Sequence, residues 1–135
     1  MKNIFGAWLV HWERENADMQ PRPLQEKSYS FALKIIDVCR KLQNQREYVL
    51  SKQLLKSGTS IGANIEEAQL AQSRKDFISK MHIAAKEAYE TRFWLKLLRD
   101  SKLIEIQEAQ QLLFDVEEII RLLVTILKTS KQNNF

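Results

Sequence analysis

Four long stretches of the chain place apolar residues at every third or fourth position. They cover about residues 26–43, 47–71, 73–99 and 106–128. Apolar residues at i, i+3, i+4 and i+7 indicate a helix with one buried face. No stretch alternates with period two, so no sheet is predicted. Four helices of similar length with short turns between them predict an all-α, up-down-up-down four-helix bundle.

A block of small residues, SGTSIGANIEEA at positions 57–68, lies inside the second helical stretch. A glycine inside a helix costs about 1 kcal/mol relative to alanine, so such a block indicates a close approach to the backbone. The apolar phase continues through the block, which favours one unbroken helix over the alternative of a kink at Gly58. We expect tight packing, within the bundle or against a neighbouring subunit, at the residues Gly58, Gly62, Ala63 and Asn64.

The N-terminal segment shows a separate, shorter helical pattern that carries Trp8 and Trp12. Pro21 and Pro23 are expected to end it, because proline lacks the backbone donor and restricts the residue before it. We therefore divide the chain into an amphipathic appendage with a proline linker (residues 1–22), the bundle (23–131) and a frayed tail (132–135). The two indoles are candidates for docking on their own bundle or on another subunit.

Composition and charge narrow the class of protein. The chain is 44% hydrophobic and 28% charged, with a net charge of +4 and a pI near 9.2. These values are typical of a soluble globular domain and permit an anionic partner. The single cysteine, Cys39, cannot form an internal disulfide, so a reducing cytoplasm is expected. The apolar start is too short to span a membrane, and no membrane partner is expected.

The residues of the second and third stretches resemble a known family. The quoted block, followed by SRKDF at 73–77 and IAAKEA at 83–88, is similar to the four-helix-bundle proteins that are also called 23S rRNA intervening-sequence proteins. The resemblance covers about residues 27–127. Many members carry a Gly-Ser-Leu-like stretch where this chain has Lys86, Glu87 and Ala88.

The resemblance implies a left-handed bundle that assembles into a ring, often a pentamer. The family is named for reading frames inside insertions in bacterial 23S rRNA genes, and its members look non-enzymatic. A related accessory protein of diversity-generating retroelements forms a basic pentameric barrel that binds nucleic acid and a reverse transcriptase. The resemblance therefore favours self-association, with RNA, DNA or another protein as further partner.

Candidate chemistry is sparse in this sequence. The histidines, His11 and His82, lie far apart, and no metal-ligand spacing occurs, so neither a metal nor a cofactor is expected. Cys39 falls on an apolar stripe and is interpreted as a small buried residue. Asn64 and Glu67 share a helix face, with Asn64 expected to hydrogen-bond between helices. No enzyme is predicted, because no set of residues meets the geometry that catalysis requires.

The positive charge is uneven along the chain. Residues 27–56 hold 7 basic and 2 acidic residues, residues 74–102 hold 8 and 4, and residues 105–131 hold 3 and 5. A ring would repeat this asymmetry and enlarge the basic surface. Either phosphate contacts or complementary contacts between subunits explain the uneven charge. For nucleic acid, contacts with the backbone of structured RNA are favoured over base-specific recognition. The candidate nucleic-acid residues are Lys34, Arg40, Lys41, Arg46, Lys52, Lys56, Arg74, Lys75 and Lys80.

Aromatic residues gather late in the third helical stretch, beside its apolar stripe. Such residues are typical anchors of subunit interfaces, although packing within the bundle is the alternative. The candidate interface residues are Trp8, Trp12, Glu67, Tyr89, Arg92, Phe93 and Trp94. The sequence thus predicts a non-enzymatic homo-oligomer, with a pentamer implied by the family, that binds RNA or other nucleic acid. The alternative is a protein-interaction scaffold with no nucleic-acid role.

Overall fold

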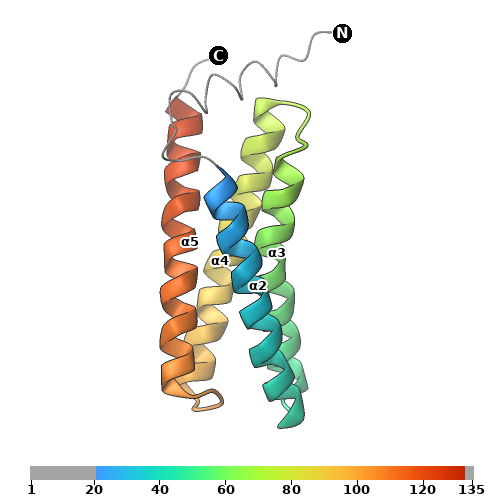
Figure 1. Cartoon of the computed structure of the whole chain (residues 1–135), viewed down its shortest axis with the longest axis vertical. Coiled ribbons are helices and arrows are strands. Elements are labelled where there is room, and N and C mark those ends of the chain that lie inside the picture. The colour runs from blue at the N-terminus through green and yellow to red at the C-terminus, as the bar shows by residue number, and fades with distance from the viewer. Residues whose placement is uncertain (1–20, 133–135) are drawn as a thin grey trace.

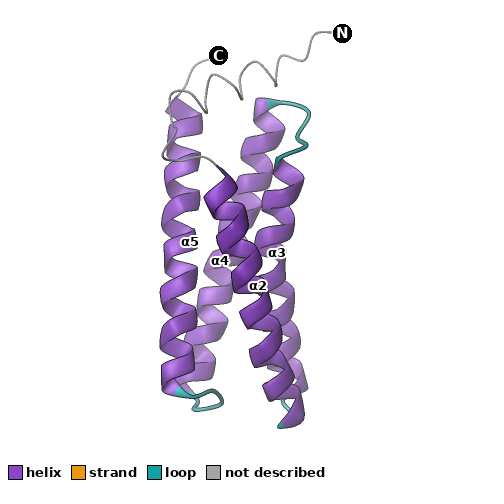
Figure 2. Ribbon diagram, viewed as in Figure 1, coloured by secondary structure: helices purple, strands orange, loops and turns teal. Residues whose placement is uncertain are grey.

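The computed structural model describes residues 21–132, and these form four α-helices without a strand. The helices are α2 (Pro21–Asn44), α3 (Tyr48–Ala68), α4 (Arg74–Asp100) and α5 (Ile106–Gln132). Successive helices run in opposite directions and pack side by side, and α5 returns to α2 (Figures 1 and 2). The predicted all-α, up-down-up-down bundle is confirmed. The predicted N-terminal appendage lies outside the described residues up to position 20.

The core is one continuous cluster of aliphatic and aromatic side chains from all four helices. Its largest fully buried members come from the stripes that the spacing predicted, for example Phe31, Leu54, Phe77 and Leu95. Within the described residues, the buried polar side chains are serines and a threonine. Two of them meet between α3 and α4, where Thr91 Oγ1 lies 3.0 Å from Ser57 Oγ. The hydroxyls of Ser28, Ser51, Ser57 and Thr91 bond to helix carbonyls, whereas Ser130 Oγ is buried without a hydrogen-bond partner among the described residues.

The helix ends differ from the sequence-based expectations in three places. Pro21 and Pro23 do not precede the first long helix but form its first turn. The N–H groups of a first turn have no partner within the helix, so proline, which lacks this group, loses no hydrogen bond there. The second helix ends at Ala68, three residues earlier than expected, and the last continues to Gln132. The start of α4 is as predicted, since Ser73 Oγ accepts a hydrogen bond from the Asp76 amide at 3.1 Å.

Two turns at the same end of the bundle stop their helices with a left-handed residue. Arg46 has φ 63° and Lys102 has φ 62°. In the first turn the amides of Arg46 and Glu47 bond to the carbonyls of Gln43 and Leu42, and the second turn repeats this pattern. This is the Schellman arrangement, in which glycine is the usual left-handed residue. Both turns here carry a cation at that position instead.

The glycine block packs α3 tightly against α2. A β-carbon added at Gly58 would lie 2.9 Å from two carbons of Ile35, closer than real contacts allow. At Gly62 the nearest atom, Ser28 Oγ, would be 3.4 Å away. The helix is continuous through both glycines, so the alternative of a break at Gly58 is wrong.

Two other residues of the block, Ala63 and Asn64, do not take part in the packing of α3 against α2. Ala63 is exposed, because it falls on the outer side of α3. Asn64 Nδ2 donates to the carbonyl of Ser60 in its own helix at 2.8 Å, not to a second helix. Ala63 and Asn64 therefore contribute little to the packing of the bundle itself.

Candidate nucleic-acid interface

The basic residues singled out from the sequence fall into two groups, according to what their side chains contact. Four of them bond to other groups of the same chain. Lys34 Nζ lies 2.8 Å from Asp115 Oδ2, Lys41 Nζ 3.0 Å from Glu108 Oε2, and Lys80 Nζ 2.9 Å from Glu67 Oε1. Arg74 Nη2 donates to the carbonyl of Ser130 at 2.8 Å. These four groups already have partners, which lowers their value for phosphate binding.

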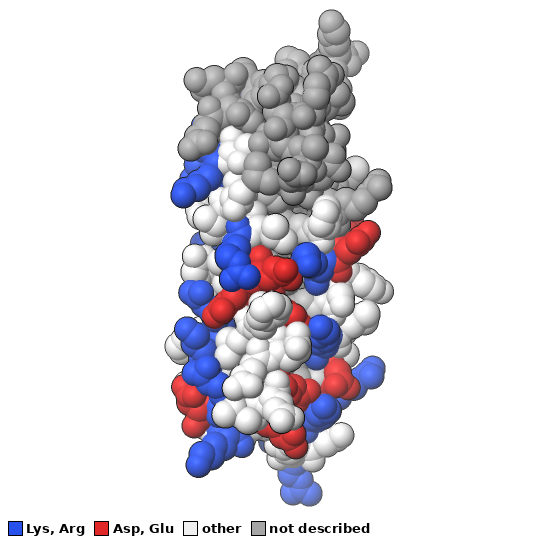
Figure 3. All heavy atoms as spheres, turned by 60° about the vertical axis from the view of Figure 1, so that its left-hand side comes forward, with Lys and Arg blue, Asp and Glu red and all other residues white. Residues whose placement is uncertain are grey.

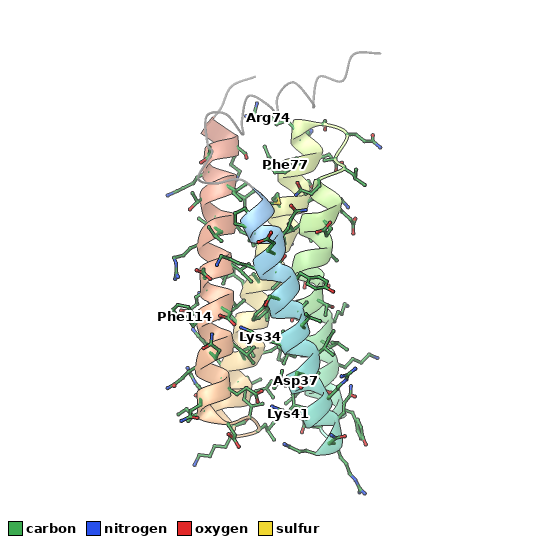
Figure 4. The ribbon with its side chains drawn as sticks, in the orientation of Figure 1. Lys34, Asp37, Lys41, Arg74, Phe77 and Phe114 are labelled. Carbon is green, nitrogen blue, oxygen red and sulfur yellow. The ribbon has the colours of Figure 1, made fainter. Side chains whose placement is uncertain are left out.

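Two of these lysines belong to a row of ion pairs between α2 and α5, here named the α2–α5 ladder. Its pairs are Lys27–Glu118, Lys34–Asp115 and Lys41–Glu108. The three lysines are seven residues apart, so they share one side of α2. Figure 4 shows Lys34 and Lys41 on this helix, with Asp37 between them. The hydrogen bond that Lys41 donates to Glu108 and the charge of that carboxylate raise the pKa of Lys41. The hydrogen bond to Asp37 and the charge of Asp37 raise this pKa further.

The ladder spans the most open junction of the bundle. A groove of about 480 Å³ lies between α2 and α5 and is lined by Lys27, Lys34, Asp115 and Glu118 together with Phe31. Figure 3 brings the α5 side forward and shows positive and negative side chains interleaved across it. The surface charge on this side of the bundle is therefore mixed in sign. In the sequence, the signal for the α2–α5 ladder was the seven-residue spacing of its lysines.

The other group consists of Arg40, Arg46, Lys52, Lys56 and Lys75, which are all exposed. Within residues 21–132 none of them forms a side-chain ion pair. Lys75 lies near the start of α4, at the opposite end from the turn that carries Arg46. The first four, here named the basic cluster, lie along the last turns of α2, the α2–α3 turn and the first turns of α3.

Local packing brings the basic cluster together. The Cys39 thiol donates to the carbonyl of Ser51 at 3.4 Å, which places the neighbouring positions Arg40 and Lys52 within about two residues of the same height on adjacent antiparallel helices. Lys52 and Lys56 are one helical turn apart on α3. Tyr48 is 62% exposed on the same helix and supplies an aromatic surface. The cluster thus offers four cations and one aromatic ring on adjoining surface.

The acidic surroundings of the cluster are limited. Burial, and then the charge of Glu90, raise the pKa of Glu87, whereas the charges of Lys56 and Lys86 lower it. Lys56 is therefore the member of the cluster whose charge is partly offset by a carboxylate.

The aromatic residues of α4 divide between the core and the surface. Trp94 packs against the core, and its Nε1 donates to Glu90 Oε2 at 3.1 Å. Phe93 is 56% exposed and meets Trp94 edge-on, with ring centroids 5.1 Å apart. The Arg92 guanidinium lies 4.7 Å from the ring centroid of Tyr89. Of the other interface candidates, Glu67 pairs with Lys80, and Trp8 and Trp12 lie outside the described residues.

One exposed apolar surface was missed at the level of sequence. Tyr29 of α2 is 68% exposed, and Leu33 one turn later is 54% exposed. In the sequence, the sign of this surface was an apolar pattern on α2 that is broader than one buried face requires. It is a surface between α2 and α3 that the bundle leaves uncovered.

The described residues contain neither a candidate metal cluster nor a helix long and apolar enough to cross a membrane. Cys39 is buried, and burial raises the pKa of its thiol to about 11. A thiol with such a pKa is protonated at neutral pH and is a poor nucleophile. Its place is that of a small apolar residue between α2 and α3, as its spacing indicated.

Comparisons with known proteins agree with this architecture. The model of the 23S rRNA-intervening sequence protein family matches residues 23–125. A solved structure from Bacteroides thetaiotaomicron, described as a protein of unknown function from the S23 ribosomal protein family, is 49% identical, with a TM-score of 0.77. The match covers 78% of this chain and 98% of that one. No curated protein matches the chain. The chain belongs to the 23S rRNA-intervening sequence protein family.

Proposed function

We propose that this protein is a non-enzymatic, self-associating helical bundle that binds nucleic acid, RNA in the first place, through the basic cluster. The observation that carries the proposal is the absence of internal ion pairs at Arg40, Arg46 and Lys52 within the described residues, while Lys34, Lys41 and Lys80 are paired. Unpaired surface cations attract phosphates without first losing an internal partner.

The shape of the cluster favours contacts with the backbone of a structured RNA over the reading of bases. The cations follow two adjoining helices and the turn between them, whereas only Tyr48 offers a ring for stacking nearby. Base-specific binding of single strands uses several aromatic side chains. Backbone contacts need only repeated positive charge.

Self-association multiplies this surface. The family resemblance suggests a ring, often a pentamer. In such a ring each copy adds its own basic cluster, and several weak sites act together. The protein would work in the cytoplasm, where a lone buried thiol such as Cys39 stays reduced.

A second candidate function is a protein-interaction scaffold with no nucleic-acid role. The exposed apolar side chains favour it, notably Tyr29, Tyr48 and Phe93, because such residues are enriched at protein interfaces. The two functions differ in one respect that can be measured directly, which is whether binding to RNA depends steeply on salt.

The test is a fluorescence-anisotropy titration of a structured RNA on nucleic-acid-free, full-length protein at several salt concentrations. The Arg40→Gln/Lys52→Gln variant should bind more weakly, and the slope of log K against log salt should fall by about 1 for each lost contact. The matched control is Lys75→Gln/Lys128→Gln, which changes the net charge equally at exposed positions elsewhere. Its binding should stay close to the wild type.

Two results would contradict the proposal. Equal weakening in both double variants would assign the binding to overall charge and not to the basic cluster. Absence of binding by the wild type even at low salt would leave the scaffold function as the better account.

A further inference from the structure

Two separate faces of the described residues carry exposed large apolar side chains, Tyr29 on one and four residues of α4 on the other. One face is a groove of about 170 Å³ between α2 and α3, here named the α2–α3 groove. The other is a row of exposed residues along the outside of α4, here named the α4 ridge. The ridge consists of Ile83, Tyr89, Phe93 and Leu97, with exposed fractions between 39% and 56%.

The α2–α3 groove has a shallow floor of small residues and taller walls. Ala32, Gly62 and Ala63 form the floor, and Tyr29 and Glu66 rise beside it. The small residues Gly62 and Ala63 therefore leave the α2–α3 groove free of large side chains. The contact of α3 with α2 does not explain this, because Ala63 is exposed and Gly62 is partly exposed.

The groove lies at the same height along the bundle as the half of the ridge that contains Ile83 and Tyr89. Thr91 touches Ser57, so Tyr89, two residues earlier in the antiparallel helix, lies near the height of Thr59. By the same rise per residue, Lys86 lies near Gly62 and Ile83 near Ile65. The groove extends from Thr59 to Glu66 and thus covers the height of the ridge from Tyr89 to Ile83. Two parallel copies side by side would bring the two faces into register.

Charge supports the same pairing. Glu66 borders the groove, and its carboxylate is exposed with only the Gln25 amide as hydrogen-bond donor, at 3.3 Å. Lys86 lies on the ridge face between Ile83 and Tyr89 and is exposed. The reach of a lysine side chain covers the offset of about one helical turn between Lys86 and Glu66. A large apolar surface with a charged pair at its edge is typical of a specific protein interface.

We propose that the α4 ridge of one copy docks into the α2–α3 groove of a second copy, with Lys86 of the ridge meeting Glu66 beside the groove. This inference rests on the self-association in the proposed function and assigns the surfaces that mediate it. The two faces differ, so the contact is heterologous, and each copy can receive one neighbour and dock into another. Small residues at 62 and 63 are then required by the neighbouring copy.

The test measures the mass of the full-length protein by light scattering and native mass spectrometry. Ala63→Trp fills the groove, and Tyr89→Glu places a charge on the ridge, at the height of the Thr59 end of the groove. Each variant alone should be monomeric at concentrations where the wild type assembles. An equimolar mixture should form a heterodimer and nothing larger, because only one intact groove and one intact ridge can meet. That heterodimer also shows that both variants are folded.

The matched control is Phe114→Glu, which changes an equally exposed aromatic residue on α5, a helix outside both faces. Its mass should equal that of the wild type. A second, milder test reverses the charges at the edge of the contact. Glu66→Lys and Lys86→Glu should each weaken assembly, and the double reversal should restore it.

The outcomes separate this inference from the proposed function. If the wild type assembles and both face variants keep its mass, the assignment of the faces is overturned while self-association stands. If each variant is monomeric but the mixture gives no heterodimer, the heterologous pairing is overturned. A wild type that is monomeric at all concentrations overturns self-association together with this inference, whereas RNA binding by the basic cluster is measured independently.

Discussion

At the scale of single residues, two glycines one turn apart in α3 play different parts. Gly58 faces Ile35, whose branched side chain cannot retreat from an added carbon, whereas Gly62 faces the smaller Ser28. The sequence predicted a close approach at both. It could not rank them, because the tightness of the contact depends on which residue of α2 lies opposite.

This difference gives the first prediction. Gly58→Ala should lower the free energy of unfolding by roughly 1 to 3 kcal/mol, since overpacking against Ile35 outweighs the better helix propensity of alanine. Gly62→Ala is the matched control and should be neutral or stabilising by up to about 1 kcal/mol. Urea denaturation followed by circular dichroism measures both. Equal effects of the two changes would contradict the geometry.

The second prediction at this scale concerns Cys39. Burial raises the pKa of its thiol from the ordinary 9.0 to about 11. The folded protein therefore retains a proton that the unfolded chain releases, so the stabilisation is fully present below pH 9 and is lost as the pH rises toward 11. Wild type should lose roughly 1 to 3 kcal/mol more than Cys39→Ala over that interval.

The measurement is urea denaturation of both proteins at several pH values from 7 to 11. Lysines and tyrosines titrate in the same interval, but they are common to both proteins, so the difference between the two curves isolates the thiol. Parallel curves would show that the thiol titrates as in the unfolded chain. Below pH 8 the two curves should run parallel in any case.

At the scale of elements, helix existence followed from periodicity, whereas helix ends depended on local chemistry. The Ser73 cap was predictable from the sequence, because the hydroxyl and Asp76 stand at the required spacing. The first turn of α2 was not, because proline both ends helices and begins them. The turns at Arg46 and Lys102 carry no glycine, so the usual signal of a helix end was missing.

The α2–α5 ladder gives the prediction at this scale. Lys34–Asp115 is its most shielded pair, because the Asp115 side chain is only 16% exposed. Lys34→Ala and Asp115→Ala should each be destabilising, and a double-mutant cycle should give a coupling of about 0.5 to 1 kcal/mol. The coupling should shrink in 1 M salt, which screens partly exposed charges.

The more exposed Lys27–Glu118 pair is the natural comparison for this cycle, with side chains 42% and 38% exposed. Its coupling should be smaller than that of Lys34–Asp115. A coupling of zero for Lys34–Asp115 at low salt would mean that the ladder contributes nothing to the α2–α5 junction, and that the buried apolar residues hold it alone.

At the scale of the whole molecule, the bundle is a unit that excludes the N-terminal segment. The family match begins at residue 23, and the Bacteroides structure aligns over 98% of its own length while covering 78% of this chain. Trp8 and Trp12 therefore lie outside the residues that the family model matches.

Deletion of residues 1–20 should therefore leave the four helices folded, with the helical circular dichroism of residues 21–132 retained and one cooperative thermal transition. The start of the deletion product coincides with the first turn of α2, so no helix is cut. Loss of helicity throughout would show that the segment belongs to the core. Comparing the masses of the deleted and full-length proteins tests whether Trp8 and Trp12 contribute to assembly.

The sequence by itself determined the bundle, its core stripes and the α4 cap, because these depend on spacing along one helix and on local chemistry. Only the tertiary structure decided which basic side chains are without an ion-pair partner in the described residues. Lys34 and Lys41 look like Arg40 and Lys52 in the sequence, yet the first two meet carboxylates of α5 and the other two do not. It also decided that Gly58 serves the bundle whereas Ala63 faces outward. Both outcomes depend on which helices are neighbours and in what register, and residues distant in the chain set that register.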